Sequence, residues 1–135
     1  MDTQALAQTF IDALHALEKG AESEVAPLTE LFADNARITN AALQLVDKEE
    51  AGRDGATHFW TEYKRTLGEC FSTFHHITID ENAAGLFWTT EGRGPDGNGV
   101  KYDGVSLLEF DESGKIGFFR GYYDTRDLTV RAETT

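Results

Sequence analysis

The spacing of apolar residues changes halfway along the chain, and this change most limits the folds open to it. From Leu6 to Leu17, apolar residues recur at intervals of four, four and three, the period of an amphipathic helix. The second half instead holds strand-like segments separated by turn sequences such as GPDGNG and DESG. The expected strands are 71–79, 86–93, 100–110 and 115–124. Helices followed by strands predict an α+β domain.

Two further helices and one short strand complete the predicted order of elements. A short helix begins near Pro27, a strand follows at 36–40, and a third helix covers 52–68. With a length of 135 residues, the chain is expected to form a single domain over 1–135. We expect a cone-shaped, curved antiparallel (mixed) sheet packed on three N-terminal helices, with an apolar pocket at the mouth of the cone.

Charge and composition narrow the range of partners. Acidic residues outnumber basic ones by 24 to 12, so the surface repels phosphate, and we expect neither nucleic acid nor an anionic membrane as a partner. No apolar run approaches the ~18 residues of a membrane span. The N-terminus lacks a basic start and an apolar core, and Cys70 has no second cysteine to pair with, so a cytoplasmic location is expected.

Three local sequences, in the right order, resemble the nuclear transport factor 2-like superfamily. They are LFADNARITN (31–40), GRDGATHFW (52–60) and LLEFDESGKIGFFRGYYD (107–124). Within that superfamily the chain resembles the SnoaL-like, ketosteroid isomerase and limonene epoxide hydrolase groups, over residues from about Leu6 to Leu128. The resemblance implies a pocket for a small apolar molecule, without a cofactor.

The isomerase roles are not filled by matching residues. Aligned with ketosteroid isomerases, the position of the catalytic base is Asn40, that of the oxyanion tyrosine is Phe10, and that of the oxyanion acid is near Ser106. An amide cannot take a proton from carbon at neutral pH, and phenylalanine has no hydroxyl. The pattern therefore argues against authentic ketosteroid isomerase activity.

The epoxide hydrolase pattern is partly retained. Its Asp–Arg–Asp arrangement aligns with Glu91, Arg93 and Asp124, with the order of acid and base exchanged on the middle strand. Asn40 matches the residue that holds water, and Ile38 stands where that family has a tyrosine. The predicted catalytic set is therefore Asp124, Arg93, Glu91 and Asn40. The alternative is a structural ion-pair cluster that closes the pocket end.

Strand alternation completes the predicted pocket. We expect Phe87, Thr89 and Glu91 to face inward, and Trp88 to face outward onto a surface that pairs two copies of the chain. Of the adjacent pair His75 and His76, only one can face the pocket. The predicted lining residues are Phe10, Ile38, Phe59, Tyr63, His75, Phe87, Thr89, Ser106, Leu108, Phe118 and Tyr122.

These patterns leave the function class open between catalysis and binding. The first expectation is cofactor-independent acid–base chemistry, such as cyclisation, isomerisation, dehydration or epoxide opening, on a small apolar or polycyclic molecule. The alternative is a non-catalytic ligand-binding module, or a dimerisation scaffold with a vestigial pocket. The histidines show no metal-binding spacing, so no metal is expected, and a homodimer through the outer sheet face is expected.

Overall fold

A computed structural model describes residues 1–93 and 97–127 of the chain. The helices are α1 (Thr3–Lys19), α2 (Val25–Thr29), α3 (Ala41–Leu45) and α4 (Gly52–Leu67), with a 3₁₀ turn at Glu22–Glu24. The strands are β1 (Phe32–Asn40), β2 (Glu50–Ala51), β3 (Cys70–Ile79), β4 (Ala83–Arg93), β5 (Gly99–Phe110) and β6 (Ile116–Tyr123). They form one six-stranded sheet in the order β2-β1-β6-β5-β4-β3.

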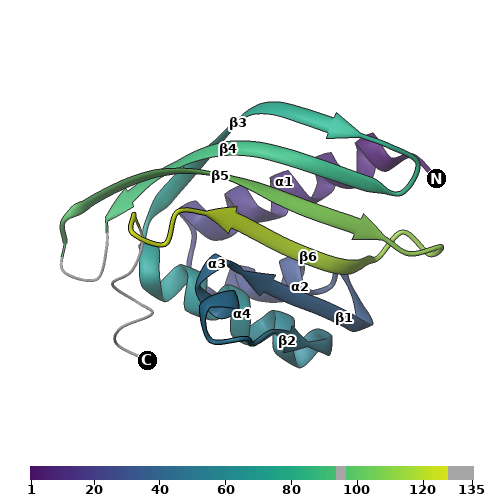
Figure 1. Cartoon of the computed structure of the whole chain (residues 1–135), viewed down its shortest axis with the longest axis horizontal. Coiled ribbons are helices and arrows are strands. Elements are labelled where there is room, and N and C mark those ends of the chain that lie inside the picture. The colour runs from purple at the N-terminus through teal and green to yellow at the C-terminus, as the bar shows by residue number, and fades with distance from the viewer. Residues whose placement is uncertain (94–96, 128–135) are drawn as a thin grey trace.

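The sheet is mixed, and the one parallel pairing within the described residues joins the two halves of the chain. β1 runs parallel to β6, with Ile38 opposite Phe119, while the other neighbours are antiparallel. Figure 1 shows this sheet curving, without closing, over α1 and α4. The predicted α+β class and the curved sheet on N-terminal helices are thereby confirmed.

Several element boundaries differ from the sequence prediction. The first strand covers Phe32–Asn40 rather than 36–40, since Phe32 already pairs with Ile116 of β6. A register shift between Phe32 and Arg37 breaks the alternation that sequence reading relies on. The short elements α3 and β2 were not predicted, since neither is long enough to show a period. The last strand ends at Tyr123, so Asp124 lies beyond it. The predicted loop at 94–99 falls partly outside the described residues.

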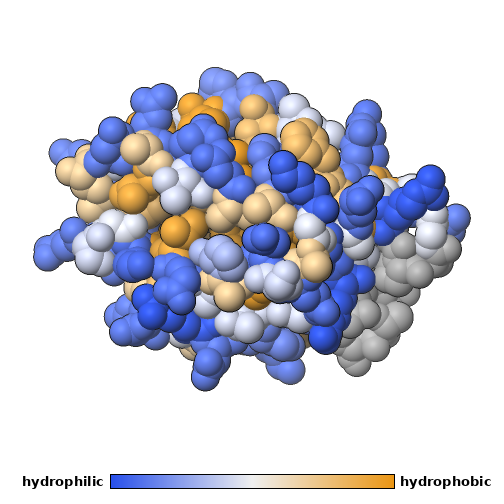
Figure 2. Space-filling view, turned by 180° about the vertical axis from the view of Figure 1, so that it is seen from behind, coloured by the Kyte–Doolittle hydropathy of each residue, from blue (hydrophilic) through white to orange (hydrophobic). Residues whose placement is uncertain are grey.

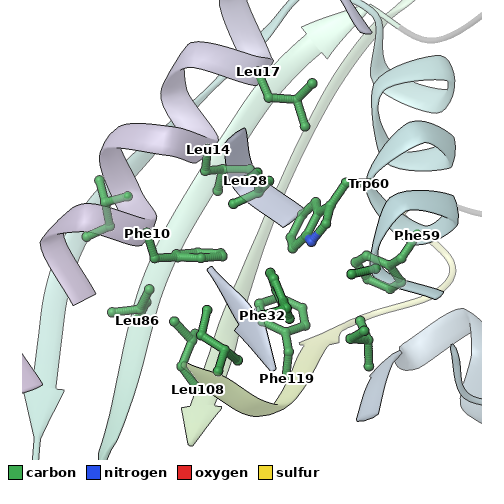
Figure 3. Close-up of a cluster of buried hydrophobic side chains, with 14 of the residues drawn as sticks. Phe10, Leu14, Leu17, Leu28, Phe32, Phe59, Trp60, Leu86, Leu108 and Phe119 are labelled. Atoms are coloured by element: carbon green, nitrogen blue, oxygen red, sulfur yellow. The ribbon is translucent and has the colours of Figure 1, made fainter. Parts of the chain in front are cut away.

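An aromatic cluster fills the space between the sheet and the two long helices. Phe10 of α1 lies 5.9 Å from Trp60 of α4 and 5.8 Å from Phe119 of β6, measured between ring centres. Figure 3 shows these rings converging with Phe32 and Phe59. Aromatic residues bury the largest apolar areas, so this cluster stabilises the packing of α4 against the sheet. It thereby fixes the positions of the other side chains on that helix.

The outer surfaces are mainly polar. Figure 2, which views the molecule from the side opposite to Figure 1, shows hydrophilic side chains interrupted by separate apolar patches. Within the described ranges, none of the helices is long and apolar enough to cross a membrane.

Candidate functional site

A cavity of about 260 Å³ lies between α4 and the concave face of the sheet. Its walls are mainly aromatic rings contributed by four elements. They are Phe59, Trp60 and Tyr63 of α4, Trp88 of β4, Tyr102 of β5, and Phe119 and Tyr123 of β6. The exposed lining residue His58 marks the end that faces solvent, and the half-buried Glu50 accepts a hydrogen bond from the His58 ring.

Trp88 forms the sheet wall of the cavity because the strand beside it leaves room for the indole. Its Nε1 donates to Ser106 Oγ at 2.9 Å, and its ring meets that of Tyr102 edge-on at 5.2 Å. Between those two residues on β5 lies Gly104, directly opposite Trp88 in the sheet. A β-carbon at Gly104 would come within 2.4 Å of the indole, so only glycine lets the ring lie flat across the strand.

A buried carboxylate lies behind the cavity wall. The side chain of Glu18, on α1, is fully buried and accepts hydrogen bonds from the Ser72 backbone N–H at 2.8 Å and from the Ser72 hydroxyl at 2.5 Å. The Tyr63 hydroxyl donates to the same carboxylate at 2.5 Å. The Ser72 and Thr90 hydroxyl oxygens lie 2.6 Å apart. Ser72, Tyr63 and Thr90 all line the cavity, so this network connects Glu18 to it.

Burial of this network shifts the acidity of its neighbours. Burial, reinforced by the nearby Glu18, raises the pKa of Tyr63 well above its ordinary value. The same two causes, burial first, raise the pKa of the Cys70 thiol to about 12. Both groups therefore keep their protons at neutral pH. Cys70 is a packed, unreactive thiol rather than a nucleophile.

Four of the residues predicted for the site line the cavity. They are Asn40, Phe59, Tyr63 and Ser106. Asn40 also caps α3, because its Oδ1 accepts from the backbone N–H of Leu43 at 2.9 Å. That bond fixes the amide orientation and leaves Nδ2, a donor, without a partner among the described residues.

Three predicted lining residues lie in the packed core instead. Phe10, Ile38 and Leu108 are each at most 1% exposed and do not border the cavity. They were predicted as lining because they are apolar and point inward, and sequence alternation cannot tell a side chain that borders a void from one that is packed on all sides.

Other predicted lining residues lie on the outer face of the sheet, so their assignment to the pocket is wrong. Ala84, Leu86, Trp88 and Thr90 are the buried side chains of β4, and the intervening residues point the opposite way. The prediction had placed Trp88 outside, and a shift of one residue reverses every side chain of a strand. The outward residues are Phe87 and Thr89 of β4, Phe118 and Tyr122 of β6, and the exposed His75 of β3, beside a register shift between Phe74 and His76.

The structure does not bring the predicted charged triad together at the cavity. Glu91 pairs with Lys101 at 3.3 Å, and the Arg93 guanidinium donates to the Gly97 carbonyl at 2.9 Å. Asp124 accepts from Arg126 at 2.7 Å, which lowers its pKa to about 2. All three side chains are exposed, and none lines the cavity. Each of the three side chains therefore forms an ion pair or a hydrogen bond at the surface, away from the cavity.

Glu18 was missed by sequence reasoning, although a signal for it existed. It follows Leu14 by four residues and Ile11 by seven, which places it on the buried face of α1. A charged residue at an apolar position of an amphipathic helix is the pattern that identifies it. Among the described residues, no group of three or more His, Cys, Asp or Glu side chains is placed to hold a metal ion.

Comparison with known proteins places the chain in a family and in a fold. The family model described as "SnoaL-like domain" matches residues 7–117. No curated protein matches the chain in sequence.

Several solved structures share the fold at low identity. One is a hypothetical protein with a ketosteroid isomerase-like fold from Catenulispora acidiphila, in complex with trimethylamine (14% identity, 92% of each chain covered, TM-score 0.74). Another is the epoxide hydrolase/cyclase-like enzyme SalBIII, which acts in pyran ring formation in the polyether salinomycin (19% identity, 93% of this chain and 95% of that one, TM-score 0.73). A third is a de novo designed protein with a curved β-sheet (15% identity, 98% and 96% covered, TM-score 0.75). Because a designed protein shares the fold as well, the fold alone does not assign a function.

Proposed function

The chain belongs to the SnoaL-like domain family, and we propose that it binds a small, largely apolar molecule in the cavity beneath its sheet. The observation that carries this proposal is the cavity itself, about 260 Å³ of space walled by aromatic rings. Protein interiors are otherwise packed about as densely as organic crystals, so a space of this size is a feature to be explained. Ligand sites typically combine such apolar walls with a few fixed polar groups.

Several polar groups on the cavity walls are held in place. Ser106 is fixed by its bond from Trp88, and Asn40 by its cap on α3, which leaves the amide Nδ2 free to donate. Ser72 and Thr90 supply hydroxyl groups on the sheet side. A ligand therefore finds mostly hydrophobic surface, with hydrogen bonds that orient it rather than supply most of its affinity.

Acid–base chemistry on the bound molecule, such as cyclisation, isomerisation, dehydration or epoxide opening, is the second function we propose. It is favoured by one observation, the fully buried carboxylate of Glu18 joined to the cavity through hydroxyl groups. The similarity to the epoxide hydrolase/cyclase-like SalBIII is consistent with such chemistry. If the protein catalyses no reaction, it is a ligand-binding module, as in the first proposal, or a dimerisation scaffold.

A cavity-filling substitution tests the binding proposal. Gly121 lines the cavity, and a β-carbon added there meets its nearest neighbour, Asn40, at 3.6 Å, an ordinary contact. Gly121→Leu should therefore occupy the space, while Gly121→Ala leaves most of it open. Both tryptophans of the chain, Trp60 and Trp88, line the cavity, so a nitroaromatic probe inside it quenches their fluorescence.

We expect 4-nitrotoluene to quench the wild type and Gly121→Ala saturably, and Gly121→Leu only weakly. Circular dichroism of each variant checks that it is folded. Saturable quenching of equal strength in Gly121→Leu would place the binding site elsewhere. An absence of saturable quenching in the wild type would also contradict the proposal.

A further inference from the structure

We propose that Glu18 is the proton acceptor of the cavity and that it acts through the hydroxyl groups of Ser72 and Thr90 on a hydroxyl-bearing ligand. The inference rests on the proposed function, because it requires a ligand in the cavity. It adds the chemical class of that ligand, an apolar molecule with an acidic O–H, and the route by which its proton leaves.

The hydrogen bonds around Glu18 are those of a carboxylate held by neutral donors. The carboxyl group is 0% exposed and receives the Ser72 N–H at Oε1 and the hydroxyls of Ser72 and Tyr63 at Oε2. The nearby cation, Lys64, donates to the Glu18 backbone carbonyl at 3.0 Å and not to the carboxylate. Fully buried carboxylates are almost always paired with a cation or metal, so a carboxylate without one calls for an explanation.

A count of hydroxyl protons shows which group donates and which accepts in the hydrogen bonds between Thr90, Ser72 and Glu18. A serine or threonine hydroxyl has one proton to donate. Since the Ser72 proton goes to Glu18, the 2.6 Å contact between Ser72 and Thr90 must use the Thr90 proton. The Thr90 oxygen then has only lone pairs left for the cavity that it lines. A ligand group that pairs with Thr90 must therefore be a donor.

Proton transfer along this chain balances without a cofactor. The ligand O–H bond breaks and its proton joins Thr90 Oγ1, the Thr90 proton passes to Ser72 Oγ, and the Ser72 proton passes to Glu18 Oε2. Both hydroxyls end with one proton each, Glu18 becomes neutral, and the negative charge moves to the ligand oxygen. Because one charge is exchanged for another inside the protein, no additional charge has to be desolvated.

The ionisable groups near Glu18 are not placed to accept the ligand's proton in its stead. The ionisable groups around this network are His15 of α1, Tyr63 and Lys64 of α4, Cys70 of β3 and Tyr102 of β5. Burial is the main cause that raises the pKa of Tyr63, Cys70 and Tyr102, so all three stay neutral. His15 Nε2 bonds the Ser72 backbone carbonyl at 2.7 Å, and Lys64 bonds the Glu18 backbone carbonyl. Glu18 is therefore the buried acid available to take a proton.

A chromogenic phenol reports binding and proton transfer separately. The probe is 4-nitrophenol, whose phenolate absorbs visible light, used at a pH where the free phenol is protonated. Tryptophan quenching measures binding, and the phenolate band of the bound probe measures transfer to the protein. We expect the wild type to show the phenolate band on binding. It should also hold 4-nitrophenol on the order of fivefold more tightly than 4-nitrotoluene, the worth of one hydrogen bond.

Three variants each remove a different member of the proton relay. Glu18→Gln, Ser72→Ala and Thr90→Val should still bind 4-nitrotoluene while the bound phenol loses its phenolate band. Ser72→Ala keeps the backbone N–H bond to Glu18, so it tests the relay even where Glu18→Gln fails to fold. Glu91→Gln is the matched control, because this carboxylate lies on the outer face and should leave the phenolate band intact.

The outcomes separate the two proposals. Binding of both probes by the wild type without a phenolate band overturns the proton relay and leaves the cavity assignment standing. A phenolate band that persists in folded Glu18→Gln, or in both Ser72→Ala and Thr90→Val, also overturns it. Failure of the wild type to bind either probe overturns the proposed function, and this inference with it.

Discussion

Replacing Gly104 with alanine should destabilise the protein through one identifiable clash. The added β-carbon would lie 2.4 Å from two indole carbons of Trp88 and 2.6 Å from the Tyr122 carbonyl oxygen. An ordinary contact needs roughly 1 Å more, so the indole must move and its bond to Ser106 weakens. Overpacking of this kind costs ~1–3 kcal/mol, and the lost hydrogen bond about 1 kcal/mol. The reduced entropy of the unfolded chain returns about 0.5–1 kcal/mol.

The net loss in the free energy of unfolding is therefore about 1–3.5 kcal/mol, or a fall in Tm of roughly 3–12 °C for a domain of this size. Urea unfolding followed by circular dichroism measures it. Gly121→Ala is the matched control, because Gly121 is also an inward-facing glycine inside a strand but has free space for a β-carbon, with 3.6 Å to its nearest neighbour. It should change stability by less than ~1 kcal/mol, with stabilisation favoured. If Gly104→Ala proved as stable as the wild type, the account of how Trp88 is positioned would be refuted.

Three further predictions concern residues away from the cavity wall. The Asp124 carboxyl should titrate at a pKa of about 2, below its ordinary pKa of 3.8, because Arg126 pairs with it. The pairing therefore stabilises the fold at pH values above 3.8, and this contribution is lost as the pH falls through about 2. If a carbon NMR titration gave the same Asp124 pKa in Arg126→Gln, the assignment would be contradicted. The Cys70 thiol, with its pKa raised from 9.0 to about 12, should react roughly a thousandfold more slowly with a thiol reagent in the folded protein than in urea, and equal rates would contradict its burial. We also propose that two copies of the chain form a homodimer through the outer sheet face, where Phe87, Val105 and Tyr122 lie together. Val105→Glu should then sediment as a monomer in analytical ultracentrifugation. A wild-type protein that is monomeric at micromolar concentration would refute the proposal.

The fold was predictable because its determinants are local and periodic. The spacing in α1 and the turn sequences between the strands of the second half both appear in the sequence. The parallel pairing of β1 with β6 has no local signal, since it joins segments about 80 residues apart and depends on the packing of α4 beneath them.

The site was less predictable because it depends on which face of each strand turns inward. The segment Phe87-Trp88-Thr89-Thr90 places two aromatic residues side by side and then two threonines. Each face of the strand therefore receives one aromatic residue and one threonine, and hydrophobicity alone does not show which face turns inward. Asn40 and Tyr63 were assigned to the cavity and do line it. Tyr63 lies on the face of α4 that borders the space, and Asn40 is the last residue of β1. Asp124 was assigned from the resemblance to epoxide hydrolases, as the last residue of the strand 115–124. In the structure that strand ends at Tyr123, and Arg126 pairs with Asp124 at the surface.

A crystal structure of the protein soaked with 4-nitrotoluene would show directly whether the cavity binds ligand. We predict density for the probe in the cavity between Trp88 of β4 and Phe59 and Tyr63 of α4. The Ser106 hydroxyl should keep its bond to the indole, since the cavity is already shaped before the probe enters. Density confined to the outer sheet face, or a cavity filled by the rings that now line it, would contradict the claim that this space is the ligand site.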